Sequence, residues 1–105
     1  LEGRMIGQIL TTASGRKSYE IYEASDEFIF RIVDIVQEQF GFTSRLPVWG
    51  LDEIYIECKR PDAHITIGWD NWSGIFVMAT NPTSDPIVEE IGDYLNSIFH
   101  DIGAM

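Results

Sequence analysis

Three consecutive segments in the second half of the chain carry the pattern of β-strands. Residues 53–59 and 64–69 alternate between apolar and polar side chains, and residues 75–80 form a short, mostly apolar run. The intervening residues, 60–63 and 70–74, are rich in Pro, Asp, Asn and Gly, which favour turns. Period-two alternation broken by short turns is typical of antiparallel pairing. The sequence therefore predicts a three-stranded antiparallel meander.

The alternation also predicts which side chains share a face of this sheet. Ile54, Ile65 and Ile67 are expected to face a core, which places Tyr55 on the other side. In the third strand, Phe76 and Met78 alternate with Ile75, Val77 and Ala79, so one of these two sets must face away from the core. If that set is Phe76 and Met78, the outer face carries an apolar patch of Tyr55, Phe76 and Met78, and such patches often mark a partner or a second copy of the same chain. Alternatively, four side chains of the preceding segment cover this face: Phe42, Leu46, Trp49 and Leu51.

An amphipathic helix is predicted over residues 25–40. With about 100° of turn per residue, most of its apolar side chains fall on one stripe, and its charged side chains lie opposite. Ser25 is expected to cap the N-terminus, and Gly41 to end the helix in a left-handed conformation. Phe30 falls outside the apolar stripe, so it is expected either to pack under a loop or to be exposed.

A second amphipathic helix is predicted near the end of the chain, with Asp85 as its N-cap, Pro86 at its first position and Gly103 at its end. Its apolar stripe comprises Ile87, Val88, Ile91, Leu95, Ile98, Phe99 and Ile102. Its acidic side chains lie on the opposite side and are Glu89, Glu90, Asp93 and Asp101.

The remaining segments complete a two-layer prediction. Residues 6–23 contain two short strand-like segments around a Ser-Gly-Arg turn, which predicts a hairpin, and residues 42–50 are expected to form a loop. The predicted fold is α+β, with an antiparallel sheet, two helices on one face and the order β-β-α-β-β-β-α. We expect a single domain over residues 5–105, because residues 1–4, Leu-Glu-Gly-Arg before Met5, have the look of a cloning remnant.

Charge is distributed unevenly along the chain. The formal net charge is -10, and no Lys or Arg follows Arg60, whereas Asp and Glu continue to Asp101. Such a segment repels nucleic-acid phosphates and would attract a basic protein surface. The simpler alternative is that the charge serves solubility alone. One cysteine and no long apolar run favour a cytoplasmic protein that does not enter a membrane.

The chain offers little material for catalysis or for metal and cofactor binding. Cys58 shares a face with Ile54, which predicts a small buried hydrophobe and not a nucleophile. His100 could join Glu89 and Asp93 on one helical strip, but a lasting metal site needs stronger ligands than these. Asp62 and Asp70 occupy turns, where Asp is common for structural reasons. No glycine spacing indicates a phosphate-binding loop. We therefore expect no catalytic, metal or cofactor residue.

The segment from Trp69 to Gly74 places two indoles three residues apart in a tight turn. One interpretation is structural, with Trp69 in the core and Trp72 over the sheet edge. The other is a binding hot spot, since tryptophan is enriched among the residues that dominate interface energy.

The sequence thus favours a non-enzymatic binding protein for a basic protein partner. Its overall composition resembles that of small acidic bacterial immunity or antitoxin proteins. The expected partner-binding residues are Tyr55, Asp70, Trp72, Phe76, Met78, Glu89, Glu90, Asp93 and Asp101. Two alternatives stay open: a small-ligand-binding domain or minor enzyme with a pocket between the sheet and residues 42–51, and a homodimer with a structural role.

Overall fold

The computed structural model describes residues 7–22 and 24–103, with side chains described as far as Phe99. The predicted cloning remnant, residues 1–4, lies outside this part. The strands are β1 (Gln8–Thr11), β2 (Lys17–Ile21), β3 (Thr43–Ser44), β4 (Val48–Trp49), β5 (Glu53–Arg60), β6 (Ala63–Asp70) and β7 (Gly74–Ala79). The helices are α1 (Phe28–Phe40), the 3-10 turn η1 (Pro82–Ser84) and α2 (Asp85–Gly103).

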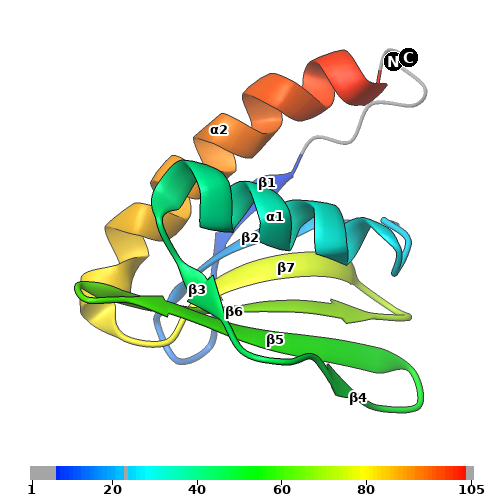
Figure 1. Cartoon of the computed structure of the whole chain (residues 1–105), viewed down its shortest axis with the longest axis horizontal. Helices are drawn as coiled ribbons and strands as arrows, with labels where there is room; N and C mark the ends of the chain where they lie inside the picture. The colour runs from blue at the N-terminus through cyan, green and yellow to red at the C-terminus, as the bar shows by residue number, and fades with distance from the viewer. Residues whose placement is uncertain (1–6, 23, 104–105) are drawn as a thin grey trace.

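One antiparallel sheet has the strand order β1-β2-β7-β6-β5-β3, and β4 pairs with β5 beyond the end of β3 (Figure 1). The predicted meander is β5-β6-β7, and the predicted hairpin is β1-β2, which joins it through antiparallel pairing of β2 with β7. Both helices cover one face of this sheet. The predicted two-layer α+β fold is therefore confirmed.

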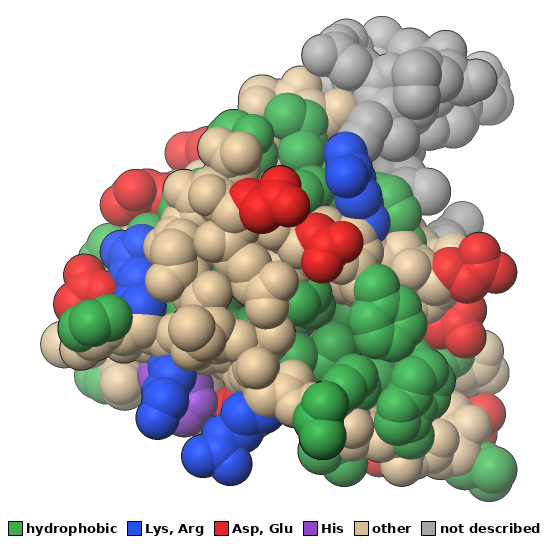
Figure 2. All heavy atoms as spheres, viewed as in Figure 1, with side chains coloured by type: hydrophobic (Ala, Val, Ile, Leu, Met, Phe, Trp, Pro, Cys, Tyr) green, Lys and Arg blue, Asp and Glu red, His purple; other side chains and the backbone are tan. Residues whose placement is uncertain are grey.

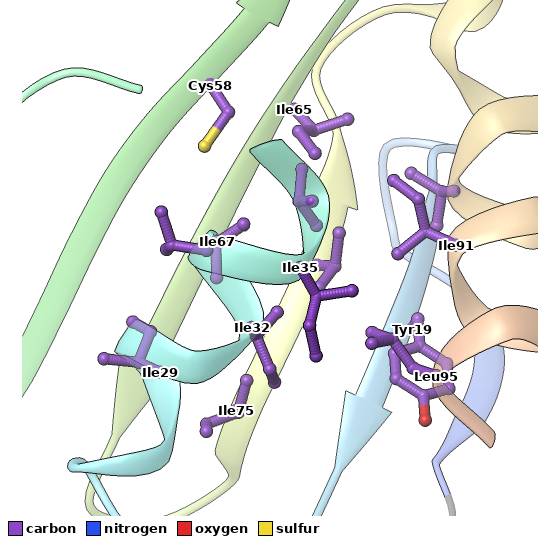
Figure 3. Close-up of a cluster of buried hydrophobic side chains, with 14 of the residues drawn as sticks. Tyr19, Ile29, Ile32, Ile35, Cys58, Ile65, Ile67, Ile75, Ile91 and Leu95 are labelled. Carbon is purple, nitrogen blue, oxygen red and sulfur yellow. The ribbon is translucent and has the colours of Figure 1, made fainter. Parts of the chain in front are cut away.

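The core lies between the helices and the sheet, where alternate strand residues meet one stripe of each helix (Figure 3). In the strands, Ile65, Ile67 and Val77 are fully buried. Ile32 of α1 and Ile91 of α2 are also fully buried, so both helices share one core. Neither helix of the described residues combines the length and apolar character needed to cross a membrane.

Both predicted N-caps are wrong, although the helices themselves are correct. The first helix begins at Phe28, after a turn in which Ser25 accepts the Phe28 N–H through its backbone carbonyl (3.1 Å), not through its side chain. Asp85 is already helical, and Asn81 caps the preceding turn by accepting the N–H of Ser84 (3.0 Å). Gly41 ends α1 with φ 74°, as predicted.

The segment predicted as a loop, residues 42–50, contains the two short strands β3 and β4. Their register explains why no strand pattern appears in the sequence: Ser44 pairs with Cys58 and Val48 with Tyr55. Three residues, 45–47, therefore face only two residues of β5, which is a β-bulge. Pro47 has no N–H to donate at this point. The two strands are halves of one edge strand, interrupted where the chain contains one extra residue.

Candidate functional site

The bulged edge strand and helix α1 form the two walls of a groove with a volume of about 760 Å³. Ile56, which is 2% exposed, belongs to the lining and comes from β5 between the two walls. The α1 wall consists of Phe30, Val33, Asp34 and Gln37. The opposite wall consists of Ser44, Arg45, Leu46, Pro47 and Val48. The alternative ligand pocket was predicted between the sheet and residues 42–51; this groove shares residues 44–48 with that prediction, but its opposite wall is helix α1.

Local contacts hold the two walls in place. The side chain of Gln37 donates to Ser44 Oγ (2.5 Å), which ties the C-terminal end of α1 to β3. The backbone N–H of Arg45 donates to the carbonyl of Glu57 (2.9 Å), so the first bulge residue remains bonded to β5. Leu46 follows and is 86% exposed. At its β3 end, the groove is therefore bordered by a segment that is hydrogen-bonded to both α1 and β5.

An exposed apolar patch borders the other end of the groove. We define the apolar patch as Phe30, Leu46, Val48, Trp49 and Leu51, whose exposed fractions run from 40% at Phe30 to 99% at Leu51. The rings of Phe30 and Trp49 lie 6.0 Å apart between centroids. Figure 2 shows hydrophobic side chains gathered at the lower right, the region of β4 in Figure 1. Trp49 and Phe30 meet on the helix side of β4, whereas Val48 pairs with Tyr55 and points to the other side. Exposed apolar residues of this kind are commonly part of a binding surface.

Carboxylates flank the apolar patch. Glu27 and Asp34 lie three residues before and four residues after Phe30, on the same side of α1, and Asp52 follows Leu51. All three carboxylates are exposed, and none forms an ion pair with the cations of residues 7–22 and 24–99. Arg45 lies toward the β3 end of the groove. Arg31 is also exposed and lies four residues after Glu27 and three before Asp34. In Figure 2, one Lys or Arg side chain lies above the hydrophobic area beside Asp and Glu side chains, and others lie at the lower left.

The sequence left two alternatives for Phe30, packing under a loop and exposure, and the structure shows both. Phe30 packs against Trp49 of the segment expected as a loop, and it remains 40% exposed. Its position outside the apolar stripe of α1 was the sequence signal for this site. The patch residues Leu46, Val48 and Leu51 carried no comparable signal, because residues 42–51 have no periodicity.

The predicted outer-face residues Tyr55, Phe76 and Met78 do share the sheet face opposite the helices, but each is half-buried. The ring of Phe76 lies over Gly68, where an added Cβ would come within 2.3 Å of it, and its centroid is 6.1 Å from that of Tyr55. Tyr55 also donates to Glu53 (3.0 Å). Burial, followed by this carboxylate, raises the pKa of Tyr55. Polar side chains thus interleave with the rings on this face.

The alternative cover for that face is not what the structure shows. Phe42 is 3% exposed and belongs to the core. Trp49 pairs with Ile54, whose side chain faces the helices. The ring of Trp49 meets Phe30 on this helix side of the sheet. Leu46 and Leu51 remain exposed.

The two indoles of the 69–74 turn have different environments. Trp69 is partly buried against the core and donates its indole N–H to the carbonyl of Ala24 (3.0 Å). Trp72 is 77% exposed. Asp70 shapes this turn, because one carboxylate oxygen accepts the backbone N–H groups of Trp72 (2.9 Å) and Ser73 (2.6 Å).

The α2 carboxylates Glu89, Glu90 and Asp93 are exposed, whereas the Asp101 side chain lies outside the described part. They belong to the helical layer, and the Tyr55 face is on the opposite side of the sheet. The structure therefore does not unite the predicted partner-binding residues into one surface.

The groups considered for catalysis are kept apart by the fold. Cys58 is 1% exposed, and burial raises its thiol pKa to about 12, so the nucleophilic thiolate is scarce at neutral pH. His64 lies instead on the outer face, with Nε2 3.1 Å from Glu57. Asp62 and Asp70 flank opposite ends of β6, and Asp62 pairs with Arg60 (2.7 Å). Among the described residues, no three His, Cys, Asp or Glu side chains are grouped to hold a metal ion.

Comparisons with protein-family models, with curated proteins and with solved structures find no match to this chain.

Proposed function

We propose that this protein is a non-enzymatic binding protein that docks a basic protein partner. The observation that supports this proposal most directly is the apolar patch, which is exposed beside the carboxylates of Glu27, Asp34 and Asp52, none of which forms an ion pair with a cation of residues 7–22 and 24–99. Apolar anchors with a charged surround are the usual anatomy of an interface core and its rim. An inhibitor of the immunity or antitoxin kind would use such a surface to cover a basic partner.

The net charge of -10 gives the proposal a kinetic consequence. Opposite charge accelerates encounter, and dissolved salt screens this attraction. For a basic partner, we expect the association rate constant to fall about tenfold between low and high salt, while dissociation changes much less.

Surface plasmon resonance between 50 and 500 mM NaCl, on a partner captured from the source cells and then purified, tests the proposal. A wild-type chain should capture a partner of high isoelectric point, and Trp49→Ala should weaken its binding. Trp72→Ala is the matched control, because Trp72 is exposed but lies outside the apolar patch. A neutral or acidic partner, or an association rate that ignores salt, would contradict the proposal.

A second candidate function is small-ligand binding in the groove, which the groove's apolar lining favours. A thermal-shift screen of metabolites distinguishes the two functions. A ligand that raises Tm in the wild-type chain but not in a Phe30→Ala variant would support this second function. No shift with any compound would leave the protein-binding proposal as the better account.

A further inference from the structure

From the groove and its charges, we infer what kind of segment it accepts: a stretch of the basic partner that inserts one apolar side chain between α1 and the bulge and places lysine or arginine beside Asp34. This inference rests on the proposed function and adds the site and the chemistry of the segment that fills it. It concerns the groove itself, whereas the proposed function requires only that a basic partner binds.

The apolar part of the inference comes from the groove lining. Val33 and Ile56 are almost fully buried yet still contribute to the lining, so a side chain that enters would meet the edge of the core. Phe30 and Leu46 belong to opposite walls and are 40% and 86% exposed. An entering apolar side chain would remove these surfaces from water, which is favourable in proportion to the area covered.

The basic part comes from the placement of charge. Asp34 lies in the α1 wall, and Glu27 lies on the same side of that helix beyond Phe30. Arg45 occupies the β3 end of the groove, so a cation on the bound segment would be repelled there and attracted toward Asp34; Arg31, one turn before Asp34, is exposed but does not line the groove. The charges therefore favour a positively charged segment and place its cation nearer Asp34 than Arg45.

The same charges disfavour a second copy of this chain as the occupant. A two-fold interface brings the same patch of each copy together. Here that would bring together two molecules that each carry a net charge of -10. A basic segment meets the same surface without this repulsion.

The test uses three synthetic pentapeptides, each acetylated and amidated, in NMR titrations of the ¹⁵N-labelled full chain. The first has phenylalanine between two pairs of lysines, the second replaces phenylalanine with alanine, and the third replaces every lysine with glutamate. We expect the first peptide to shift the amides of Val33, Gln37 and Leu46 most. We expect it to bind at least about fivefold more tightly than the other two, since both of its features are needed.

Matched variants separate the site from general charge. Asp34→Lys and Glu38→Lys make the same change of charge one turn apart on the exposed side of α1, but only Asp34 lines the groove. Asp34→Lys should weaken binding of the lysine-phenylalanine peptide at least threefold more than Glu38→Lys does. Circular dichroism should show both variants folded, because both positions are solvent-exposed.

The possible failures are distinguishable. Shifts that gather instead around Glu89, Glu90 and Asp93, equal binding of the alanine peptide, or equal effects of the two lysine variants would overturn the groove assignment and leave the proposed function intact. Failure of the purified basic partner to bind would overturn the proposed function itself. Sedimentation showing a dimer that Leu46→Glu dissociates would assign the groove to a second copy and so overturn this inference.

Discussion

Replacing Gly92 with alanine should destabilise the protein, although alanine is the better helix former. Gly92 lies within α2, and an added Cβ there would come within 2.7 Å of Tyr19 and 2.9 Å of Ile9. These distances are shorter than real Cβ contacts, so a neighbour would have to move. The sign of the effect depends on whether the ring of Tyr19 can yield.

The contacts of Tyr19 indicate that it cannot yield at low cost. Its side chain is fully buried, and its hydroxyl donates to Asn96 (2.6 Å), one turn beyond Gly92 on the same helix. The same Asn96 oxygen accepts the backbone N–H of Gly7 (2.8 Å). The ring is therefore fixed at its hydroxyl end while the new methyl group presses on its side.

The magnitudes decide the outcome. Removing glycine from a helix interior gains about 0.5–1 kcal/mol, whereas overpacking a well-filled core costs about 1–3 kcal/mol. We therefore expect Gly92→Ala to lower the free energy of unfolding by about 1–2 kcal/mol. In a domain of this size, that corresponds to a decrease in Tm of about 4–16 °C.

Urea unfolding followed by circular dichroism measures this change. Ser97→Ala on the same helix is the control: its hydroxyl donates back to the carbonyl of Tyr94, and the position is exposed. That variant should stay within about 0.5 kcal/mol of wild type. If Gly92→Ala proves as stable as wild type or more so, the close approach of α2 to Tyr19 is not as the structure describes it.

Two further predictions concern titration. Burial raises the pKa of Tyr19 to about 12, so folding favours the neutral phenol. Its contribution to stability should be complete below pH 10 and decline as pH rises toward 12, and unfolding measured at pH 8–12 should show a shallower decline for Tyr19→Phe. Cys58, whose pKa burial also raises to about 12, should react with a thiol reagent at pH 8 far more slowly in the native protein than in urea, and rapid native labelling would contradict its buried placement.

The elements that sequence reasoning predicted correctly are those whose signal is local and periodic. The alternation in residues 53–59 and 64–69 survives as β5 and β6 because one face of each strand must be buried. The apolar stripe of α2 likewise determines which side of that helix meets the sheet. Neither inference required knowledge of any partner strand.

The predictions that were wrong depended on distant residues. Asp85 was expected to cap α2, but its carboxylate accepts the backbone N–H of Lys17 (2.9 Å) and lies 3.3 Å from the guanidinium of Arg16. Residues at the β1–β2 turn thus bind the Asp85 carboxylate, which the local sequence predicted to cap the helix. Similarly, β3 and β4 are strands only because β5 offers them hydrogen-bonding partners, and no pattern within residues 42–50 reports that pairing.

The position of the acidic residues determines how a basic partner would meet this molecule. Helix α2 packs over β2, β7 and β1, whereas the groove lies at β5, two strands beyond β7. Two strand spacings amount to about 10 Å, and the exposed face of α2 is farther still, whereas the Debye length at physiological salt is about 8 Å. Screening therefore weakens the action of Glu89, Glu90 and Asp93 on a segment in the groove, while Asp34 acts at contact distance. For a partner seated in the groove, neutralising the α2 carboxylates should slow association less than neutralising those beside the apolar patch, and this difference should widen as salt is raised.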